Sequence, residues 1–299
     1  TRVHGNARLK RIDTDRIMHE LEHRRIVIVT GFQGVNKYDN YTTLGRGGSD
    51  TTAVALAAAL HADACEIYTD VDGVYTADPR IVPKARKLEE ITYDEMLDLA
   101  TLGAGVLHNR SVEMAKKYGV QLVVRSSLND HEGTIVKEET SVERMLISGV
   151  ALDKNTARIS VIGLKDEPGM AFRLFNMLAK EGINVDVILQ SIGRENSKDI
   201  SFTISRDEAD EAVKIIEANK ARIGCTGISC NKEVVKVSIV GAGMMSNPGV
   251  AAKMFEALFN ENININMIST SEIRITVLIN EKDAERAVNA VHDAFGLEE

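Results

Sequence analysis

Residues 42–52 combine the residue types that bind small anions. The run Thr-Thr-Leu-Gly-Arg-Gly-Gly-Ser-Asp-Thr-Thr places glycines on both sides of an arginine and leads directly into an Ala-rich stretch. Glycines let backbone N–H groups turn toward an anion, a helix N-terminus adds partial positive charge, and a guanidinium can bind a carboxylate or phosphate bidentately. A simple N-cap at Ser49 or Asp50 would not require Gly-Arg-Gly-Gly. We therefore predict an anion site formed by Arg46, Gly47, Gly48, Ser49 and Asp50.

A second candidate segment, residues 68–80, reads Tyr-Thr-Asp-Val-Asp-Gly-Val-Tyr-Thr-Ala-Asp-Pro-Arg and begins where an apolar run ends. Loops at the carboxyl ends of strands are where α/β sheets bind ligands. A tight turn at Asp72-Gly73 is the alternative, but it leaves Asp78-Pro79-Arg80 unexplained. An EF-hand is a poor match because the Glu at its twelfth position is missing.

Other chemistries find little support in the sequence. The three cysteines, Cys65, Cys225 and Cys230, form no disulfide framework and lack zinc-site spacing. Gly241-Ala242-Gly243 lacks the third glycine of a dinucleotide-binding fingerprint. We expect neither a protein-bound metal site nor thiol catalysis.

Composition excludes further classes of function. The net charge is -8, with 44% hydrophobic and 27% charged residues, so the basic face of a general nucleic-acid binder is not expected. No apolar run approaches the roughly 20 residues that cross a bilayer. We expect a cytoplasmic protein that binds neither nucleic acid nor membrane.

These loops need a scaffold, and the first half of the chain predicts an α/β sheet. Short apolar runs, read as strands, alternate with segments of helical pattern. The expected strands are 26–29, 65–68 and 121–125, and the expected helices are 51–60, 92–100 and 111–117. The pattern ends in a charged stretch near Lys137, and we place a domain boundary after residue 143.

The second half contains an internal repeat. Pro168-Gly169 recurs as Pro248-Gly249, and an Asn follows sixteen residues after each proline, at Asn184 and Asn264. Apolar residues between these landmarks follow helical spacing in both copies. Each copy is predicted to be a ferredoxin-like βαββα(β) unit, one over residues 144–230 and one over 231–299, with strands that the two units can exchange.

Taken together with Gly31-Phe32-Gln33-Gly34 and with Ser269-Thr270-Ser271-Glu272, these motifs resemble the bacterial aspartate kinases over essentially the whole chain. The resemblance implies an α/β fold, the C-terminal part of an amino-acid kinase domain followed by two ACT domains. It also implies transfer of a phosphoryl group from ATP, with Mg2+, to the β-carboxylate of L-aspartate. The product would be 4-phospho-L-aspartate, the first step of lysine, threonine and methionine biosynthesis.

The resemblance also assigns roles to residues. Arg46 would hold the α-carboxylate of aspartate, with Ser49 and Asp50 beside it as catalytic residues. The acceptor carboxylate is already ionised at pH 7, so no general base is needed and Asp50 would orient the substrate. The residues expected to bind the nucleotide are Thr69, Asp70, Tyr75, Thr76, Ala77, Asp78, Pro79 and Arg80.

The chain departs from the family pattern at three places. Gly105 stands where several relatives have a Lys near ATP, and Asn109 stands where a Pro often follows Leu-His. No Lys-x-Gly-Gly-Thr-Ser segment is found, and the family's phosphate-binding lysine lies in that segment. We therefore expect this chain alone to be incomplete for catalysis.

The repeat is expected to bind an end-product amino acid, lysine and/or threonine, at interfaces between ACT domains of a homo-oligomer that is at least a dimer. Pro-Gly helix starts supply amides for the effector carboxylate, and acidic or amide side chains would take its ammonium. The alternative is that Pro-Gly merely starts a helix and the asparagines cap turns. The candidates in the first copy are Asp166, Gly169, Met170, Ala171, Asn184, Val185, Asp186 and Gln190. Those in the second copy are Asn247, Pro248, Gly249, Ala251, Asn264, Ile265, Ser269, Thr270, Ser271 and Glu272.

Two other functions remain open at this point. The chain could be a non-catalytic regulatory fragment or subunit that partners a catalytic chain, or an amino-acid kinase with another carboxylate acceptor. The tandem repeat argues against the latter, and the loops at Arg46 and Asp70 have no use in a purely regulatory subunit.

Overall fold

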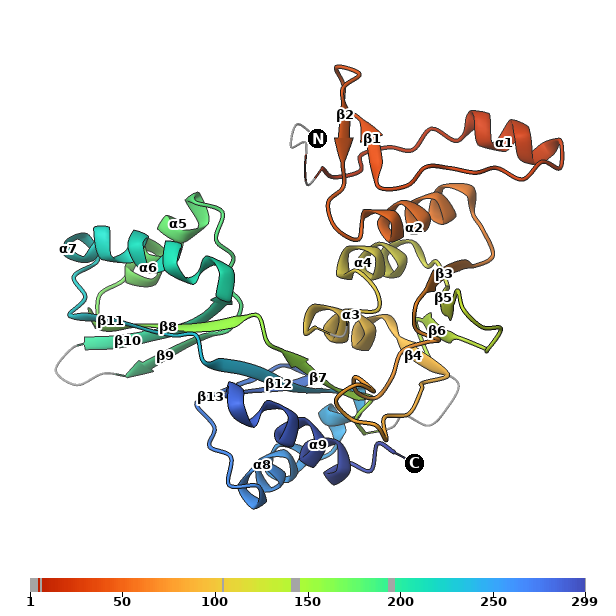
Figure 1. Ribbon diagram of the computed structural model, residues 1–299. Coiled ribbons are helices and arrows are strands. Elements are labelled where there is room, and N and C mark those ends of the chain that lie inside the picture. The colour runs from red at the N-terminus through yellow and green to blue at the C-terminus, as the bar shows by residue number, and fades with distance from the viewer. Residues whose placement is uncertain (1–4, 6, 104, 141–145, 193–196, 299) are drawn as a thin grey trace.

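The computed structural model describes residues 5, 7–103, 105–140, 146–192 and 197–298. An N-terminal arm leads into an α/β portion, which is followed by two four-stranded sheets, each with its own helices (Figure 1). The predicted domain boundary after residue 143 lies outside the described residues.

The arm contains α1 (Asp15–Glu22) and a hairpin of β1 (Gln33–Val35) and β2 (Tyr41–Thr43). The strand predicted at 26–29 is wrong, because the segment is neither helix nor strand. Ile26 and Ile28 are 96% and 92% exposed. An apolar run becomes a strand when a neighbour satisfies its backbone, and this run has no partner strand in the described chain.

The α/β portion comprises α2 (Gly48–Leu60), β3 (Cys65–Thr69), β4 (Glu90–Thr92), α3 (Tyr93–Thr101), α4 (Asn109–Tyr118), β5 (Leu122–Ser126) and β6 (Thr134–Lys137). The sheet order is β3-β5-β6-β4, with β3 parallel to β5 and β4 parallel to β6. Val54 of α2, Met96 of α3 and Val112 of α4 join Leu122 and Val124 in one core. The predicted helices, and the predicted strands at 65–68 and 121–125, are confirmed to within a few residues.

The first repeat unit, residues 156–231, contains β8 (Thr156–Lys165), α5 (Met170–Lys180), β9 (Ile188–Ile192), β10 (Ser197–Ser205), α6 (Ala209–Ala218), α7 (Lys220–Ile223) and β11 (Gly227–Asn231). A 3₁₀ turn, Arg206–Glu208, precedes α6. The sheet is antiparallel in the order β11-β8-β10-β9. Leu174, Leu178 and Ile216 from the helices are fully buried against it.

The second repeat unit consists of β7 (Gly149–Asp153) and residues 234–298. Its elements are β12 (Val234–Val240), a 3₁₀ turn (Ala242–Ser246), α8 (Val250–Asn260), β13 (Met267–Thr270), β14 (Arg274–Asn280), a 3₁₀ turn (Glu281–Asp283) and α9 (Ala284–Ala294). The order is β13-β14-β12-β7. Strand β7 therefore occupies the place in this sheet that β11 occupies in the first, although it precedes the first unit in sequence.

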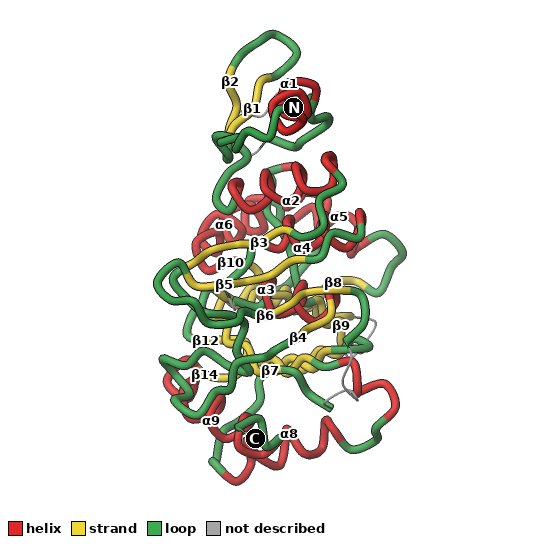
Figure 2. The backbone as a smooth tube through the Cα atoms, turned by 90° about the vertical axis from the view of Figure 1, so that its right-hand side faces the viewer, coloured by secondary structure: helices red, strands yellow, loops and turns green. Residues whose placement is uncertain are grey.

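The second sheet is covered on both faces. Val235, Val237 and Ile239 of β12 pack against α8 and α9. On the opposite face, Val240 belongs to the core of the α/β portion, whereas Val234 packs with Val187 of the first unit. Both views place this sheet next to the α/β portion and joined to the first unit (Figures 1 and 2). The second unit is thus the part of the molecule that contacts both neighbours.

Candidate active site and effector sites

The Gly-rich segment forms a tight turn at the start of α2. Gly47 is the N-cap residue with φ 70°, and the Gly48 N–H donates to the Gly45 carbonyl. A Cβ on Gly47 would lie 2.4 Å from the His108 ring, and one on Gly48 would lie 2.8 Å from Leu44 Cβ. Both the backbone conformation and the close packing therefore require glycine here.

The three side chains predicted to act on aspartate lie on this turn. Arg46 and Ser49 are exposed, and in the described part of the chain the Arg46 guanidinium has no hydrogen-bond or ion-pair partner. Asp50 is half-buried, and burial raises its pKa while the His108 backbone N–H and the charge of His108 oppose that rise. An unpaired cation beside the amino end of a 13-residue helix suits an incoming carboxylate.

Two residues that sequence reasoning missed hold this turn in place. The Arg110 guanidinium donates to the Leu44 carbonyl at 2.9 Å and to the Ala7 carbonyl at 3.1 Å. His108, the N-cap residue of α4, lies against Gly47. A possible signal was the Leu-His-Asn-Arg run itself, in which a histidine and an arginine flank the start of a predicted helix.

The predicted nucleotide loop begins at the end of β3. Thr69 Oγ1 donates to Asp70 Oδ1 at 3.0 Å, and Asp70 is exposed. Arg80 is exposed and its guanidinium donates to both carboxylate oxygens of Asp78. Tyr75 donates to Asp72 at 2.7 Å. The residues that face solvent and could meet a nucleotide are therefore Asp70, Pro79 and Arg80.

Two of the predicted nucleotide residues, Thr76 and Ala77, are buried instead. Thr76 is fully buried, with Oγ1 3.0 Å from His292 Nε2 and donating to the Leu297 carbonyl at 3.2 Å. Ala77 belongs to the core of the second repeat unit. The side chains of Thr76 and Ala77 thus face α9 and the residues after it, where they join the loop to the second unit.

The two halves of the predicted active site are not in contact. Among the described residues no hydrogen bond or ion pair joins the Arg46 turn to the loop at 69–80. In Figure 1, α2 lies on the side of the arm, whereas the chain after β3 continues toward the second unit. A Cβ on Gly105 would meet only the Gly103 carbonyl oxygen, at 3.9 Å.

The predicted nucleotide loop carries side chains of the types that bind ATP with Mg2+. Mg2+ on a nucleotide commonly needs one or two carboxylates in addition to phosphate oxygens, and an exposed guanidinium binds phosphate. Asp70 and Arg80 supply these groups. Within the described ranges no group of three or more His, Cys, Asp and Glu side chains is placed to hold a metal ion by itself. The residues therefore fit a metal that arrives with its nucleotide.

The Pro-Gly helix starts have the same geometry in both repeat units. Gly169 and Gly249 are N-cap residues with φ 90° and 95°. Their carbonyls accept from Arg173 N and Lys253 N at 2.9 Å in each case. A Cβ on either glycine would have no heavy atom within 4 Å, and both glycines are exposed.

The other effector candidates lie mostly at the surface. In the first unit Asn184 and Gln190 are exposed and Val185 is half-buried, while Met170 is buried and Ala171 half-buried. The regular strand after α5 begins at Ile188 rather than at Asn184, although Thr203 already pairs with Asp186 and Val187. In the second unit, the exposed candidates are Asn247, Pro248, Asn264, Thr270, Ser271 and Glu272, and the half-buried ones are Ala251, Ile265 and Ser269.

Two of the three acidic candidates, Asp166 and Asp186, are already bound to lysines. Asp166 Oδ1 lies 2.6 Å from Lys198 Nζ. Asp186 is hydrogen-bonded to Lys236 Nζ, and the same ammonium lies 3.1 Å from Asp153 Oδ2. Asp186 was expected to bind an effector ammonium and Asp166 to lie at the helix start that meets the effector carboxylate, but in this structure ammonium groups of the chain itself contact both carboxylates.

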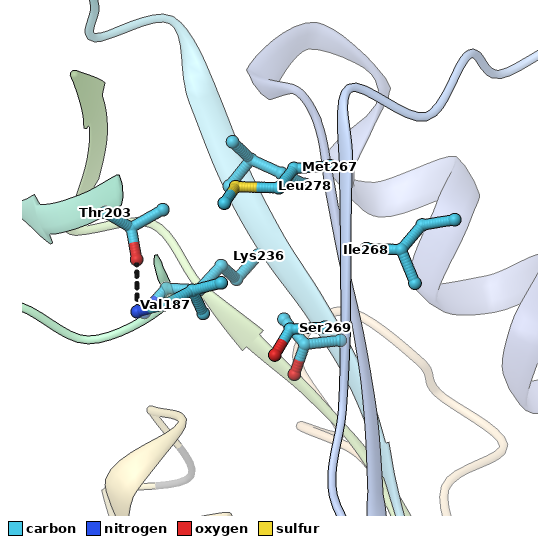
Figure 3. Close-up of a pocket in the computed structure, with 8 residues that line it drawn as sticks. Val187, Thr203, Lys236, Met267, Ile268, Ser269 and Leu278 are labelled. Atoms are coloured by element: carbon cyan, nitrogen blue, oxygen red, sulfur yellow. Dashed lines mark hydrogen bonds between the residues drawn. The ribbon is translucent and has the colours of Figure 1, made fainter. Parts of the chain in front are cut away.

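Lys236 lines a small cavity between the two repeat units. The other lining residues are Val187, Thr203, Met267, Ile268, Ser269, Thr276 and Leu278. Figure 3 shows Met267 and Leu278 close together near Lys236, and the Thr203 hydroxyl directed at the Val187 backbone N–H. The cavity volume of about 10 Å³ accommodates about one water molecule. An amino acid would enter only if the joint opened.

The chain was then compared with known proteins. The amino acid kinase family matches residues 1–126, and the ACT domain matches residues 159–219 and 237–295. An aspartate kinase of Pseudomonas putida is 50% identical over 297 residues, which is 99% of this chain and 72% of the relative. Among the described residues, no helix is long and apolar enough to cross a membrane.

Two crystal structures of E. coli aspartokinase III match the fold at 30% identity. The complex with aspartate and ADP, described as the R-state, has a TM-score of 0.80. The complex with lysine and aspartate, described as the T-state, has a TM-score of 0.75. In both cases the match covers 94% of this chain and 63% of the E. coli chain, so this chain spans a little less than two thirds of that protein.

Proposed function

The chain belongs to the aspartokinase family, and from this premise we propose that the protein transfers a phosphoryl group from ATP to the β-carboxylate of L-aspartate. The observation that carries the proposal is the exposed Arg46 guanidinium, without a partner in the described chain, beside the amino end of α2. This arrangement suits the α-carboxylate of an amino acid. The E. coli relative is described in complex with aspartate and ADP.

The residues of this chain would contribute binding and orientation. Arg46 holds the α-carboxylate, and Ser49 with Asp50 orients the ammonium and the acceptor. The acceptor carboxylate is ionised at neutral pH and is itself the nucleophile, so no side chain has to remove a proton. Asp70 and Arg80 would hold the nucleotide, and Mg2+ bound with it would supply positive charge at the phosphates. Catalysis then depends on alignment and charge stabilisation.

We further propose that the two ACT domains bind lysine, threonine or both as feedback effectors, in an oligomer assembled through these domains. The E. coli relative is described in complex with lysine. The two Gly N-caps with matching geometry and open space support the proposal, because their helix starts offer backbone N–H groups to a carboxylate.

The test of the kinase function is trapping of the acyl phosphate. The protein is incubated with ATP, Mg2+, L-aspartate and hydroxylamine, and formation of the aspartyl hydroxamate is measured. We expect a product with L-aspartate and much less with L-glutamate. Turnover that prefers another carboxylate acceptor would overturn the substrate assignment, and absence of turnover with every acceptor would favour a regulatory role.

A further inference from the structure

The contact between Lys236 and Asp186 crosses the joint between the two repeat units. Lys236 lies on β12 of the second unit, and Asp186 lies before β9 of the first. The lysine residue is 7% exposed. Its other carboxylate partner, Asp153, is its neighbour on β7 in the same sheet. One buried ammonium thus joins a fixed carboxylate of its own unit to a carboxylate of the other unit.

The two carboxylates are held very differently. Asp153 accepts from Thr156 Oγ1 and from Asn155 N in addition to Lys236. The Asp186 side chain is 40% exposed, against 20% for Asp153. Asp186 is therefore the partner that can leave Lys236 and turn to solvent at a small desolvation cost.

The charge around the joint also favours an additional ammonium. Burial raises the pKa of the Asp98 carboxyl on α3, the charge of Arg274 lowers it, and the charges of Asp94 and then Asp186 raise it. Arg274 lies 3.5 Å from Asp98. Arg274 is thus taken up by Asp98, whereas Asp153 and Asp186 share the single ammonium of Lys236. Two carboxylates on one ammonium leave one negative charge without a cation of its own.

We propose that Lys236 is a built-in competitor of the amino-acid effector, because its ammonium occupies Asp186 in the closed joint and must leave when the effector's ammonium binds there. The inference rests on the proposed effector function of the ACT domains. It goes beyond that function by naming the residue that sets effector affinity and the contact between units that effector binding breaks. Breaking this contact opens the small cavity beside Val187 and Met267.

The competition predicts a gain of affinity when Lys236 is removed. A site that is competent for only a fraction of the time binds with an affinity reduced by that fraction. If Lys236 leaves Asp186 free for about a tenth of the time, Lys236→Met tightens binding by about tenfold. An ordinary supporting residue would instead weaken binding when it is removed.

The experiment is calorimetric titration of the full chain with L-lysine and, separately, with L-threonine. Four proteins are compared: wild type, Lys236→Met, Asp186→Asn and the double variant. Lys232→Met is the matched control, because Lys232 also pairs with an aspartate, Asp210 at 2.7 Å, but on an exposed surface. Thermal unfolding checks that each variant is folded, and Lys236→Gln replaces Lys236→Met if the latter is not.

The inference is supported if Lys236→Met tightens binding of either amino acid, Lys232→Met does not, and the gain disappears in the Asp186→Asn background. It is overturned if folded Lys236→Met binds as the wild type does or more weakly, or if the gain persists without Asp186. Absence of binding by wild type and Lys236→Met alike would overturn both this inference and the effector function, and would leave the kinase function standing.

Discussion

Replacing Arg46 tests whether its exposed guanidinium binds substrate or supports the fold. Arg46→Ala would remove the proposed bidentate contact with the substrate carboxylate, and the resulting fall in kcat/KM for aspartate is expected to correspond to about 2 to 4 kcal/mol of transition-state stabilisation. Because the described chain offers Arg46 no partner, stability should change little. The measurement is steady-state kinetics with each substrate varied in turn.

The control for this prediction is the KM for ATP, which should change far less than that for aspartate. Arg46→Lys retains the positive charge but lacks the planar guanidinium, so its kcat/KM for aspartate should lie between that of the wild type and that of Arg46→Ala. Unchanged kinetics for aspartate in Arg46→Ala would remove Arg46 from the substrate site.

Gly47 and Gly119 form a matched pair for a second prediction. Both have positive φ, 70° and 64°, but a Cβ on Gly119 meets open space whereas one on Gly47 meets the His108 ring. Gly119→Ala is expected to cost about 1 to 2 kcal/mol of folding free energy, from the left-handed backbone alone. Gly47→Ala should cost roughly 1 to 3 kcal/mol more from overpacking. Urea denaturation of the two variants gives the comparison, and equal costs would contradict the packing of His108 on the turn.

At the level of residues, the sequence predicted the glycine turn well, because Gly-Arg-Gly-Gly before an Ala-rich run has a local physical meaning. It could not predict that Thr76 is buried against His292, which lies 216 positions further along the chain. Nor could it show that Asp186 is engaged by Lys236. Both depend on how units that are distant in sequence pack, and no local pattern of charge or turn residues encodes that packing.

A buried carboxylate of helix α3, that of Glu95, contacts the second repeat unit and carries a third prediction. Glu95 completes the capping box with Thr92 and also accepts from Ser148 Oγ at 2.7 Å and Ala242 N at 3.0 Å. Glu95→Gln exchanges one acceptor oxygen for a donor, so at least one of these groups is left unsatisfied. We expect a loss of about 1 to 3 kcal/mol in the free energy of unfolding.

Asp94→Asn is the matched control, because Asp94 is the preceding residue in the same helical turn and pairs with Lys116 at the surface. Its cost should stay below about 1 kcal/mol. Chemical denaturation measures both variants. Equal effects of the two would mean that Glu95 contributes nothing beyond an ordinary surface charge.

The contact between the predicted nucleotide loop and α9 involves His292, which is expected to make the stability of the protein depend on pH. His292 is fully buried, and burial lowers its pKa from the ordinary 6.5, against the opposing charges of Asp293 and Glu298. The folded protein binds this proton less tightly than the unfolded chain does. Its contribution to stability is therefore complete above about pH 6.5 and is lost as the pH falls below that value.

Thermal unfolding between pH 5 and 7.5 tests this expectation. Below about pH 6.5, His292 alone can change the free energy of unfolding by up to about 1.4 kcal/mol per pH unit. His292→Gln should therefore reduce the dependence of stability on pH in this range. His131→Gln is the control, because the His131 side chain is 67% exposed, and it should leave the slope as it is. A slope unchanged in His292→Gln would assign the pH dependence to other groups.

At the level of elements, the repeat was predictable because each copy carries its own helical periodicity and its own Pro-Gly start. The position of β7 was not, because a five-residue apolar strand shows nothing of which sheet it joins. The second unit has no described strand after α9, and β7 pairs with the free side of β12 instead. The failed strand at 26–29 has the same cause, since a strand is stabilised by a neighbour that the local sequence does not specify.

For the whole molecule, the burial of the nucleotide loop has a consequence for communication between sites. The segment that starts at the predicted nucleotide residues continues into the core of the second repeat unit, where Ala77 and Val82 pack with Val288 and Val291 of α9. Val150 of β7 also donates its N–H to the Thr76 carbonyl at 2.7 Å. The loop therefore belongs to two units at once.

This shared loop carries the last prediction, that nucleotide binding stabilises α9. A ligand that orders residues 69–75 reduces the freedom of the residues that follow, and local opening of α9 requires the contacts of Thr76 with His292 and Leu297 to separate. Adding ADP and Mg2+ should therefore slow hydrogen exchange of the amides of α9, whereas α5 of the first unit, which lies in a separate core, should exchange as before.

By linkage, an effector bound to the second unit must change nucleotide affinity by the factor by which the nucleotide changes effector affinity. Thr76→Val keeps the shape of the side chain but removes its hydroxyl, and it should diminish the protection of α9. Protection that spreads equally to α5, or an ADP complex with no change in α9, would contradict a connection through this loop.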